Sequence, residues 1–245
     1  MEDIQKALEN AAKLAGEKGL TRFTRFLDPA EAELGRYLAR QYGARFSAWG
    51  GYDQAERVVG CFGPAGEEMD TAQYPVVCLH SRYSSKFCSV THRDLLGSFM
   101  ALGLTRSCAG DMIIAGADIY LFAHAQTADF IAQSMKSAGK APLDFHVLTE
   151  TPEMPEPEGT RFSAVVSSLR LDGVLAAAYR LSRSEAADSI RAGLVKVNHL
   201  ACDRVDLPLQ EGALLSLRGR GRVRLVSVDG TTRKQRIGIT LFRYE

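Results

Sequence analysis

The pattern of apolar and polar positions over residues 170–198 predicts two short helices followed by a strand. Four apolar residues of the first helix recur at helical spacing: Leu171, Val174, Leu175 and Ala178. Ser182 followed by Glu185 is typical of a capping box, so a second helix is expected to begin there and to end at Gly193. The alternation of residues 194–198 then predicts a strand whose two valines face inward.

Residues 76–148 predict the order strand, helix, strand, strand, helix, strand. The expected strands are residues 76–81, 111–115, 118–124 and 143–148, and the expected helices are residues 91–103 and 127–139. This order is typical of ferredoxin-like folds, which RNA-recognition motifs share. Tyr120 and Phe122 fall on one face of the third strand. We interpret them as core or interface residues, with base stacking as the alternative, because the basic and glycine residues of RNA-recognition motifs are missing there.

The rest of the chain is divided by changes in composition. Residues 1–70 predict two helices, the second beginning at Asp28 and ending near Gly43, and then short strands. Residues 149–160 alternate prolines with glutamates, which sustain neither helix nor sheet. We therefore expect a multi-domain α+β chain. Its expected parts are an N-terminal α/β region (1–72), a ferredoxin-like middle domain (73–149), a linker (150–160) and a C-terminal domain of two helices packed on a small antiparallel sheet (161–245).

The composition is that of an ordinary globular chain, but its charge is divided unevenly. The 245 residues are 46% apolar and 24% charged, and no apolar run reaches the roughly 18 residues that a membrane helix needs. The amphipathic N-terminus does not resemble a signal peptide, so we expect a cytoplasmic protein with no membrane contact. Residues 161–245 contain 15 Lys and Arg against 8 Asp and Glu, whereas the chain before them is acidic. This excess predicts a polyanionic partner.

The five cysteines predict neither a metal site nor a disulfide framework. They include no C-x-x-C pair, and their number is odd. Cys78 with His80 and Cys88 with His92 could be imagined as four ligands, but the first pair lies in an apolar strand pattern. We therefore expect reduced core cysteines, no bound metal and no cofactor.

Basic residues of the C-terminal part are the candidate chemistry. Arg183 and Ser184 lie at the predicted start of a helix, where unpaired backbone N–H groups suit a phosphate; a solvated helix start is the alternative. Four arginines recur at every second position, which would place them on one side of an extended chain: Arg218, Arg220, Arg222 and Arg224. A hairpin turn is expected at Asp229 and Gly230. Three basic residues follow it: Arg233, Lys234 and Arg236. The series predicts a nucleic-acid surface.

A possible second phosphate contact is predicted at the start of the helix over residues 91–103. Its His-Arg-Asp sequence occurs in protein kinases, but no glycine-rich loop precedes it and no Asp-Phe-Gly follows, which argues against a kinase. Thr91 and Asp94 are instead typical of a helix cap. His92 and Arg93 then project from the first helical turn, where they either contact phosphate or simply begin the helix.

Residues 169–219 resemble the S-four RNA-binding domain, which is named after a ribosomal protein. They contain its Arg-Leu-Asp, Ser-Arg and Val-x-Val-Asn sequences in order. The resemblance implies that the two helices and the adjoining strand grip structured RNA through six residues: Arg170, Ser182, Arg183, Arg191, Lys196 and Asn198. Two departures predict turns of a different shape. His199 stands where many members have glycine, and Glu211-Gly212 replaces the usual Gly-Asp.

Upstream, the sequence THRDLLGSFMALGLTRSCAGDMII resembles the YlmH-like family, as does the C-terminal extension that contains LSLRGRGRVRL. Members join an N-terminal region and a middle domain like an RNA-recognition motif to an S-four domain, and they are linked to ribosomes and cell division in bacteria. The resemblance implies a non-catalytic protein that binds rRNA or tRNA. It further implies the ribosome or its large subunit as partner, a role in rescue of stalled ribosomes or in cell division, and no small-molecule substrate.

An RNA-modifying enzyme, or its accessory subunit, is the alternative function, because S-four domains are often joined to such enzymes. A pseudouridine synthase needs its catalytic aspartate inside a much larger domain, and the Arg-Leu-Asp sequence here belongs to the S-four helix. A methyltransferase needs a glycine-rich loop between strand and helix, which residues 109–120 lack. A protein adaptor that uses the acidic N-terminal part stays compatible with RNA binding by the C-terminal part.

Overall fold

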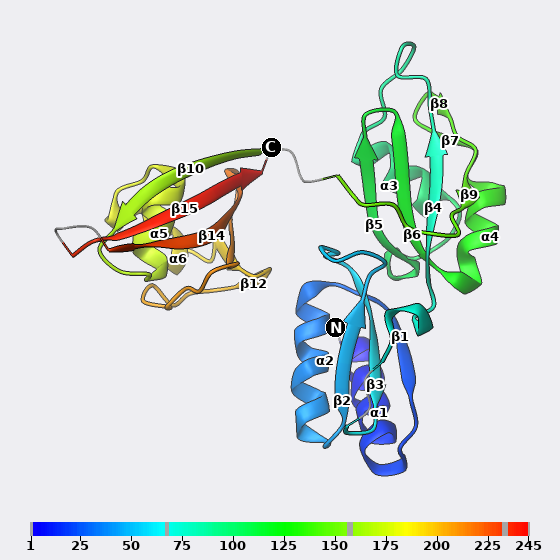
Figure 1. Ribbon diagram of the computed structural model, residues 1–245, viewed down its shortest axis with the longest axis horizontal. Helices are drawn as coiled ribbons and strands as arrows, with labels where there is room; N and C mark the ends of the chain where they lie inside the picture. Colours follow the sequence, from blue (N-terminus) through cyan, green and yellow to red (C-terminus); the bar gives the residue numbers. More distant parts are fainter. Residues whose placement is uncertain (1, 67–68, 156–158, 232–234, 245) are drawn as a thin grey trace. The chain divides into compact units, whose positions relative to one another are not determined.

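The computed structural model describes residues 2–66, 69–155, 159–231 and 235–244, and the chain divides into two compact units (Figure 1). The first unit contains residues 1–155 and the second contains residues 156–245. Both units combine helices with antiparallel sheets, which confirms the expected multi-domain α+β class. Across the described ranges, no helix is both long enough and apolar enough to span a membrane.

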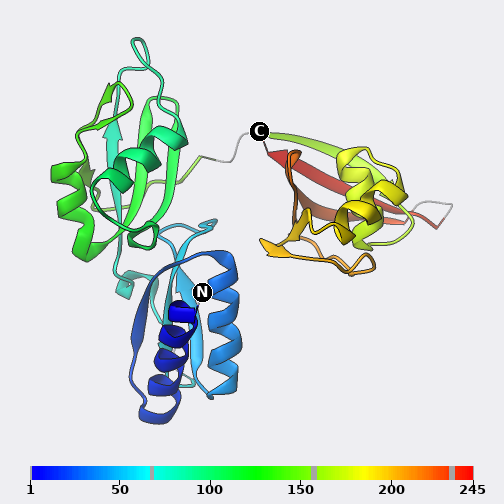
Figure 2. The same ribbon diagram turned by 180° about the vertical axis from the view of Figure 1, so that it is seen from behind.

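The N-terminal part of the first unit is a three-stranded antiparallel sheet with two helices on one face (Figure 2). The helices are α1 (Glu2–Lys18) and α2 (Pro29–Gln41), and the strands lie in the order β1 (Arg22–Leu27), β3 (Val58–Gly63) and β2 (Arg45–Trp49). Asp28 caps α2 by accepting a hydrogen bond from the backbone N–H of Glu31, which confirms the predicted helix start. The sequence does not predict β1, which pairs with the distant β3.

The middle part of the first unit is a four-stranded antiparallel sheet in the order β5, β6, β4, β9, with two helices packed on one face. Its elements are β4 (Val76–Arg82), α3 (His92–Ala101), β5 (Ala109–Ala115), β6 (Asp118–His124), α4 (Ala125–Ser134) and β9 (His146–Val147). Short 3-10 turns cover Thr71–Gln73 and Arg106–Cys108. The first and third strands are central, which confirms the ferredoxin-like topology.

The end of the middle part differs from the prediction. Helix α4 ends at Ser134, because the chain then forms a short hairpin whose turn contains Gly139 at a φ of 56°. The hairpin consists of β7 (Ser137–Ala138) and β8 (Ala141–Pro142). The strand expected over residues 143–148 pairs at only two residues, since Leu143 and Phe145 are buried in the core beneath the helices.

A partly buried carboxylate joins the two parts of the first unit. Asp111 of β5 accepts hydrogen bonds from the Tyr52 hydroxyl at 2.9 Å and from the backbone N–H groups of Glu56 at 2.7 Å and Arg57 at 3.2 Å. The Arg57 side chain in turn donates to the carbonyl oxygen of Ala109. Burial raises the pKa of the Asp111 carboxyl, because these hydrogen bonds only partly replace the lost solvation.

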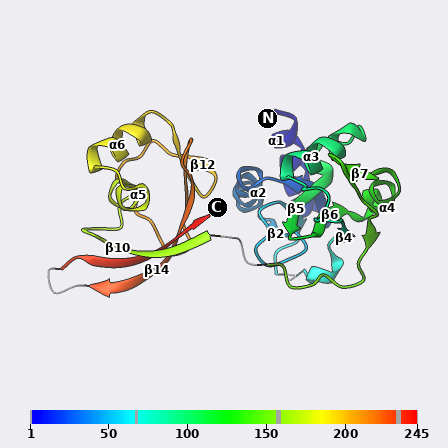
Figure 3. The same cartoon turned by 90° about the horizontal axis from the view of Figure 1, so that it is seen from above.

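The second unit is a six-stranded antiparallel sheet in the order β10, β15, β14, β13, β11, β12, with two helices on one side (Figure 3). Its strands are β10 (Gly159–Val166), β11 (Val195–Val197), β12 (Leu200–Ala201), β13 (Leu214–Leu217), β14 (Gly221–Thr231) and β15 (Ile237–Tyr244), and its helices are α5 (Leu171–Tyr179) and α6 (Arg183–Arg191). Ser182 and Glu185 form the expected capping box of α6. The prediction of two helices on an antiparallel sheet is confirmed.

The predicted alignment of four arginines on one side of an extended chain is wrong. Arg218 and Arg220 lie in the exposed turn between β13 and β14, whereas Arg222 and Arg224 lie on β14 itself. The glycines that separate these residues, Gly219 and Gly221, have φ of 79° and 80°. Glycine adopts such angles readily, so the chain reverses direction within the series.

The predicted hairpin is present as the antiparallel pair β14 and β15, but its turn does not lie at Asp229 and Gly230. Strand β14 continues to Thr231, and the shift of register beside Gly230 marks a bulge. The Asp229 carboxylate accepts hydrogen bonds from the hydroxyls of Ser227 and Thr240, which hold the bulge against β15. The predicted contacts Arg233 and Lys234 lie outside the described residues.

Candidate nucleic-acid interface

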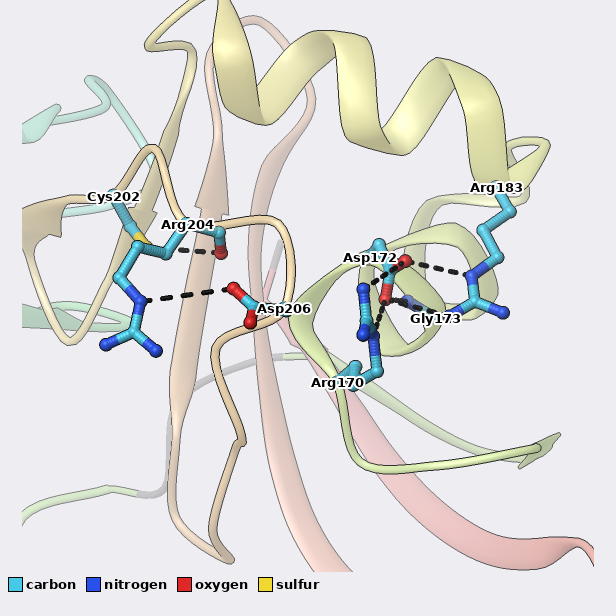
Figure 4. A network of polar contacts seen from close by, with 7 residues as sticks. All are labelled: Arg170, Asp172, Gly173, Arg183, Cys202, Arg204 and Asp206. Carbon is cyan, nitrogen blue, oxygen red and sulfur yellow. Dashed lines mark hydrogen bonds and ion pairs between the residues drawn. The ribbon is translucent and has the colours of Figure 1, made fainter.

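A single buried carboxylate holds two arginines at the start of the two helices of the second unit (Figure 4). Asp172 is 4% exposed and lies in the first turn of α5. It accepts a hydrogen bond from Nε of Arg170 at 3.2 Å, from Nε of Arg183 at 2.9 Å and from the backbone N–H of Gly173 at 2.9 Å. Residues on two different helices therefore meet at one aspartate.

The electrostatics of this cluster favour a charged carboxylate. Burial acts to raise the pKa of Asp172, but hydrogen bonds from Arg183, Arg170 and Gly173 outweigh it and lower the pKa below its ordinary value. The side chains of Arg170 and Arg183 are 44% and 54% exposed. We call these two residues the arginine pair. Each member uses part of its guanidinium on Asp172 and presents the remainder to solvent.

Two backbone N–H groups at the start of α6 already donate hydrogen bonds to side chains of the protein. The Ser182 side chain accepts a hydrogen bond from the N–H of Glu185 at 3.2 Å, and the Glu185 carboxylate accepts from the N–H of Ser182 at 2.7 Å. These two N–H groups are therefore not available to a phosphate. Ser184 is exposed on the same turn. The arginine pair, rather than the helix terminus, provides the positive charge for an anion here.

A second group of basic side chains lies on the face of the sheet that the helices leave open. Lys196, Ser216 and Arg222 are directly opposite one another on β11, β13 and β14, so they share one face. Their neighbours Val195 and Val223 are buried in the core under the helices, which places this row on the opposite side.

Tyr244 organises the arginines of that face. Nε of Arg224 donates a hydrogen bond to the Tyr244 hydroxyl at 2.7 Å, and the guanidinium carbons of Arg222 and Arg224 lie 5.1 Å and 5.9 Å from the ring centroid. Both distances are within the range of cation–π attraction. We call Lys196, Arg222, Arg224 and Tyr244 the outer sheet surface. Sequence reasoning missed Tyr244, although it occupies the alternating position next to Phe242 at the end of β15.

Two of the remaining predicted contacts, Arg191 and Asn198, join neither group. Arg191 is exposed at the end of α6 opposite Arg183 and pairs with Asp188 at 3.2 Å. Asn198 has a structural role, because its side-chain oxygen accepts a hydrogen bond from the N–H of Leu214 at 2.8 Å. Asn198 and His199 form the turn between β11 and β12, with φ of 48° and 69°.

The two candidate residues in the first unit lie at the start of α3, as predicted. Thr91 and Asp94 form a capping box, and His92 and Arg93 are exposed beside it. Partial burial and the charge of Arg106 lower the pKa of His92, which favours the neutral form of its ring. Arg93 is the cation of this pair. Within the described part of the chain, no three His, Cys, Asp or Glu side chains are grouped as a metal site requires.

Comparisons with known proteins place this geometry in a family. The description "YlmH, N-terminal" matches residues 1–63, "Putative RNA-binding domain in YlmH" matches residues 70–151, and "S4 domain" matches residues 169–215. The chain is 34% identical over 241 residues to the ribosome-associated protein quality control protein P2 of Bacillus subtilis (strain 168). The matched residues make up 98% of this chain and 93% of that protein.

A solved structure supports the fold. The cell division protein ylmH from Streptococcus pneumoniae has 21% sequence identity and a TM-score of 0.52, over 60% of this chain and 90% of that one. At this identity the likeness concerns the fold alone. The full-length relative and the three matched regions, in the same order as the parts seen in the structure, are decisive: the chain belongs to the YlmH family and carries an S-four domain.

Proposed function

We propose that this protein is a non-catalytic RNA-binding protein that grips structured RNA through its S-four domain. The observation that carries the proposal is the arginine pair, which one buried carboxylate holds in a defined position at the surface. Fixed guanidinium groups favour phosphate binding because less side-chain freedom is lost when they bind. The outer sheet surface adds two more arginines and an aromatic ring, a combination that suits an RNA backbone and its bases.

The RNA of this proposal is ribosomal RNA or tRNA, and the site of action is the large ribosomal subunit in the cytoplasm. The relative from Bacillus subtilis is named for ribosome-associated quality control, which supports a role in the rescue of stalled ribosomes. None of the matched descriptions names a catalytic activity, in keeping with a binding role. The proposed contacts are the arginine pair, Ser184, Arg191, Lys196 and the basic residues 218–224, 233 and 234, with Arg93 as a second site.

The salt dependence of RNA affinity tests the proposed surface. The full-length chain is titrated with a labelled RNA hairpin at several salt concentrations, together with Arg183→Ala and the double variant Arg222→Ala with Arg224→Ala. Each lost phosphate contact should reduce the slope of log affinity against log salt by about one. Arg36→Ala, an exposed arginine on α2, is the charge-matched control for Arg183→Ala and should behave as wild type. Unchanged affinity and slope in both test variants would refute the assignment of this surface to RNA binding.

Crosslinking in the native cell tests the ribosomal part of the proposal. The protein is crosslinked to RNA, and the bound RNA is sequenced. Peaks on large-subunit rRNA and on tRNA are the expected result. Peaks scattered over mRNA would refute the ribosomal role while leaving RNA binding intact.

A further inference from the structure

The sheet of the middle part has a second face, and the N-terminal part covers half of it. Phe122 of β6 is fully buried on this face and stacks on Tyr52, with ring centroids 4.9 Å apart and an interplanar angle of 27°. Cys78 of β4, directly opposite Phe122, is 2% exposed. Gly51 packs so closely that a Cβ there would lie 2.4 Å from the Phe122 ring. This half of the face is closed to any ligand.

The other half of the same face carries three adjacent rings. His80 of β4 and Tyr120 of β6 are directly opposite in register, and their ring centroids are 5.0 Å apart with an interplanar angle of 34°. His146 of β9, opposite His80 on the other side, adds a third ring at 5.1 Å. His146 is exposed, and Tyr120 and His80 are partly exposed. The rings therefore form a continuous strip across three strands.

Polar contacts hold the rings of this strip in place, and Arg82 places a positive charge beside them. Nε2 of His80 lies 2.9 Å from a carboxylate oxygen of Asp118, and Nδ1 of His80 lies 3.4 Å from Nε2 of His146. Arg82 is exposed at the end of β4, and its charge acts on the Tyr120 hydroxyl. The Asp118 carboxylate is engaged with His80, so Arg82 is the neighbouring cation that can meet an anion.

From this arrangement we infer that the open half of the middle sheet binds one unpaired RNA nucleotide. The base stacks on the rings of Tyr120 and His80, and Arg82 contacts the phosphate. Aromatic side chains on central strands are a common platform for unstacked bases, and stacking of this kind tolerates any base. The strip is made of rings with polar edges and not of aliphatic side chains, which favours a base over an apolar protein surface. Because the Phe122 half is closed, the platform is too short for a run of bases.

The inference rests on the proposed function only in that the ligand is RNA. The site itself lies in the first unit and not in the S-four unit. Its test uses the full-length chain, a fluorescent oligouridine as unpaired probe, and an excess of unlabelled RNA hairpin to occupy the S-four domain. Tyr120→Ala should weaken oligouridine binding about tenfold, the loss expected for one stacked base. Tyr120→Phe keeps the ring and should bind as wild type. Phe130→Ala is the matched control, since Phe130 is an exposed aromatic residue of α4 and belongs to the helix layer.

Photocrosslinking gives a second readout that does not depend on the stability of a variant. Oligouridine that contains 4-thiouridine is crosslinked to the wild-type chain, and the modified peptides are identified by mass spectrometry. Crosslinks within β4 or β6 are expected. Oligouridine binding that is unchanged in Tyr120→Ala, no binding of oligouridine, or crosslinks confined to residues 159–244 would each overturn the inference.

The two proposals fail in different ways. If hairpin affinity depends on Arg183 and not on Tyr120, the hairpin binds to the S-four domain alone. Oligouridine affinity that depends on Tyr120 and persists when hairpin is in excess concerns the middle sheet alone. Each variant therefore serves as the control for the other site.

Discussion

The two large sheets of this protein have the same layers, but they differ in the face that the helices do not cover. Each is antiparallel and covered on one face by two helices. In the middle part, the second face is half covered by the N-terminal part through Phe122 and Asp111. In the S-four unit, the second face carries Lys196, Arg222 and Arg224 within the described residues. The layout of a sheet and its helices therefore does not determine where RNA can bind; the element that covers the second face does.

The two aspartates that join segments in these units show the same difference at the scale of single side chains. Asp111 accepts hydrogen bonds from a phenol and from backbone N–H groups, and burial raises its pKa. Asp172 is held by two arginines and has a lowered pKa. Asp111 closes an interface inside the protein. Asp172 leaves two guanidinium groups facing outward, where they are able to bind a ligand.

The largest expected effect separates the two aromatic residues of β6. Phe122→Ala should lower the free energy of unfolding of the first unit by about 3–5 kcal/mol, because it removes a fully buried ring and leaves a cavity. Tyr120→Ala, two residues away on the same face, should cost far less because its ring is partly exposed. Urea unfolding followed by the fluorescence of Trp49, the single tryptophan in the chain, reports on this unit. Equal losses would contradict the division of the sheet into closed and open halves.

Asp172→Asn should lower the stability of the S-four unit by about 1–2 kcal/mol, because a buried charged acceptor is replaced by a weaker neutral one. The same change should weaken RNA binding by releasing the arginine pair. The change makes the net charge more positive by one, so long-range attraction alone would strengthen binding. Affinity for the RNA hairpin at fixed salt distinguishes the two effects. Tighter binding would show that total charge, and not the position of the arginines, controls affinity.

The two aspartates also predict opposite responses to acid. The stability that Asp172 contributes is present above the ordinary carboxyl pKa of about 3.9 and is lost as the pH falls through its lowered folded-state pKa. The contribution of Asp111 is fully present below about 3.9 and is lost as the pH rises through its raised pKa. Amide hydrogen exchange should therefore show α5 losing protection on acidification before β5 does. Asp172→Asn should remove the acid-dependent part of the loss in α5.

Much of the S-four unit could be predicted from its sequence because its signals are local. The capping box of Ser182 and Glu185 and the glycine after α6 lie within a few residues of the structure that they determine. The pairing of Asp172 with Arg183 could not be predicted in the same way. It joins residues 11 positions apart and exists only because the two helices pack side by side.

The features that the sequence did not predict also depend on contacts between distant residues. Strand β1 contains Arg22 and Arg25, which weaken its apolar alternation, and it is formed by pairing with the distant β3. The arginines of residues 218–224 have a period of two, which is consistent with a strand and equally with a turn between two strands. Asp229 and Gly230 have the composition of a turn but form a bulge, because the distant Thr240 binds the Asp229 side chain. Phe122 could be placed on a face, but not beneath Tyr52.

The smallest expected effect concerns the turn at which the chain departs from many S-four domains. Asn198 and His199 both have positive φ, and the second position of such a two-residue turn favours glycine. His199→Gly should therefore stabilise the S-four unit by about 0.5 kcal/mol, since relief of the backbone strain at His199 exceeds the entropy that glycine loses on folding. Asn198→Ala is the opposite control and should destabilise the unit, because it removes the hydrogen bond from the N–H of Leu214. Slower exchange of the β11 amides in His199→Gly is the expected readout. Faster exchange would mean that the histidine side chain stabilises the turn by more than its backbone costs.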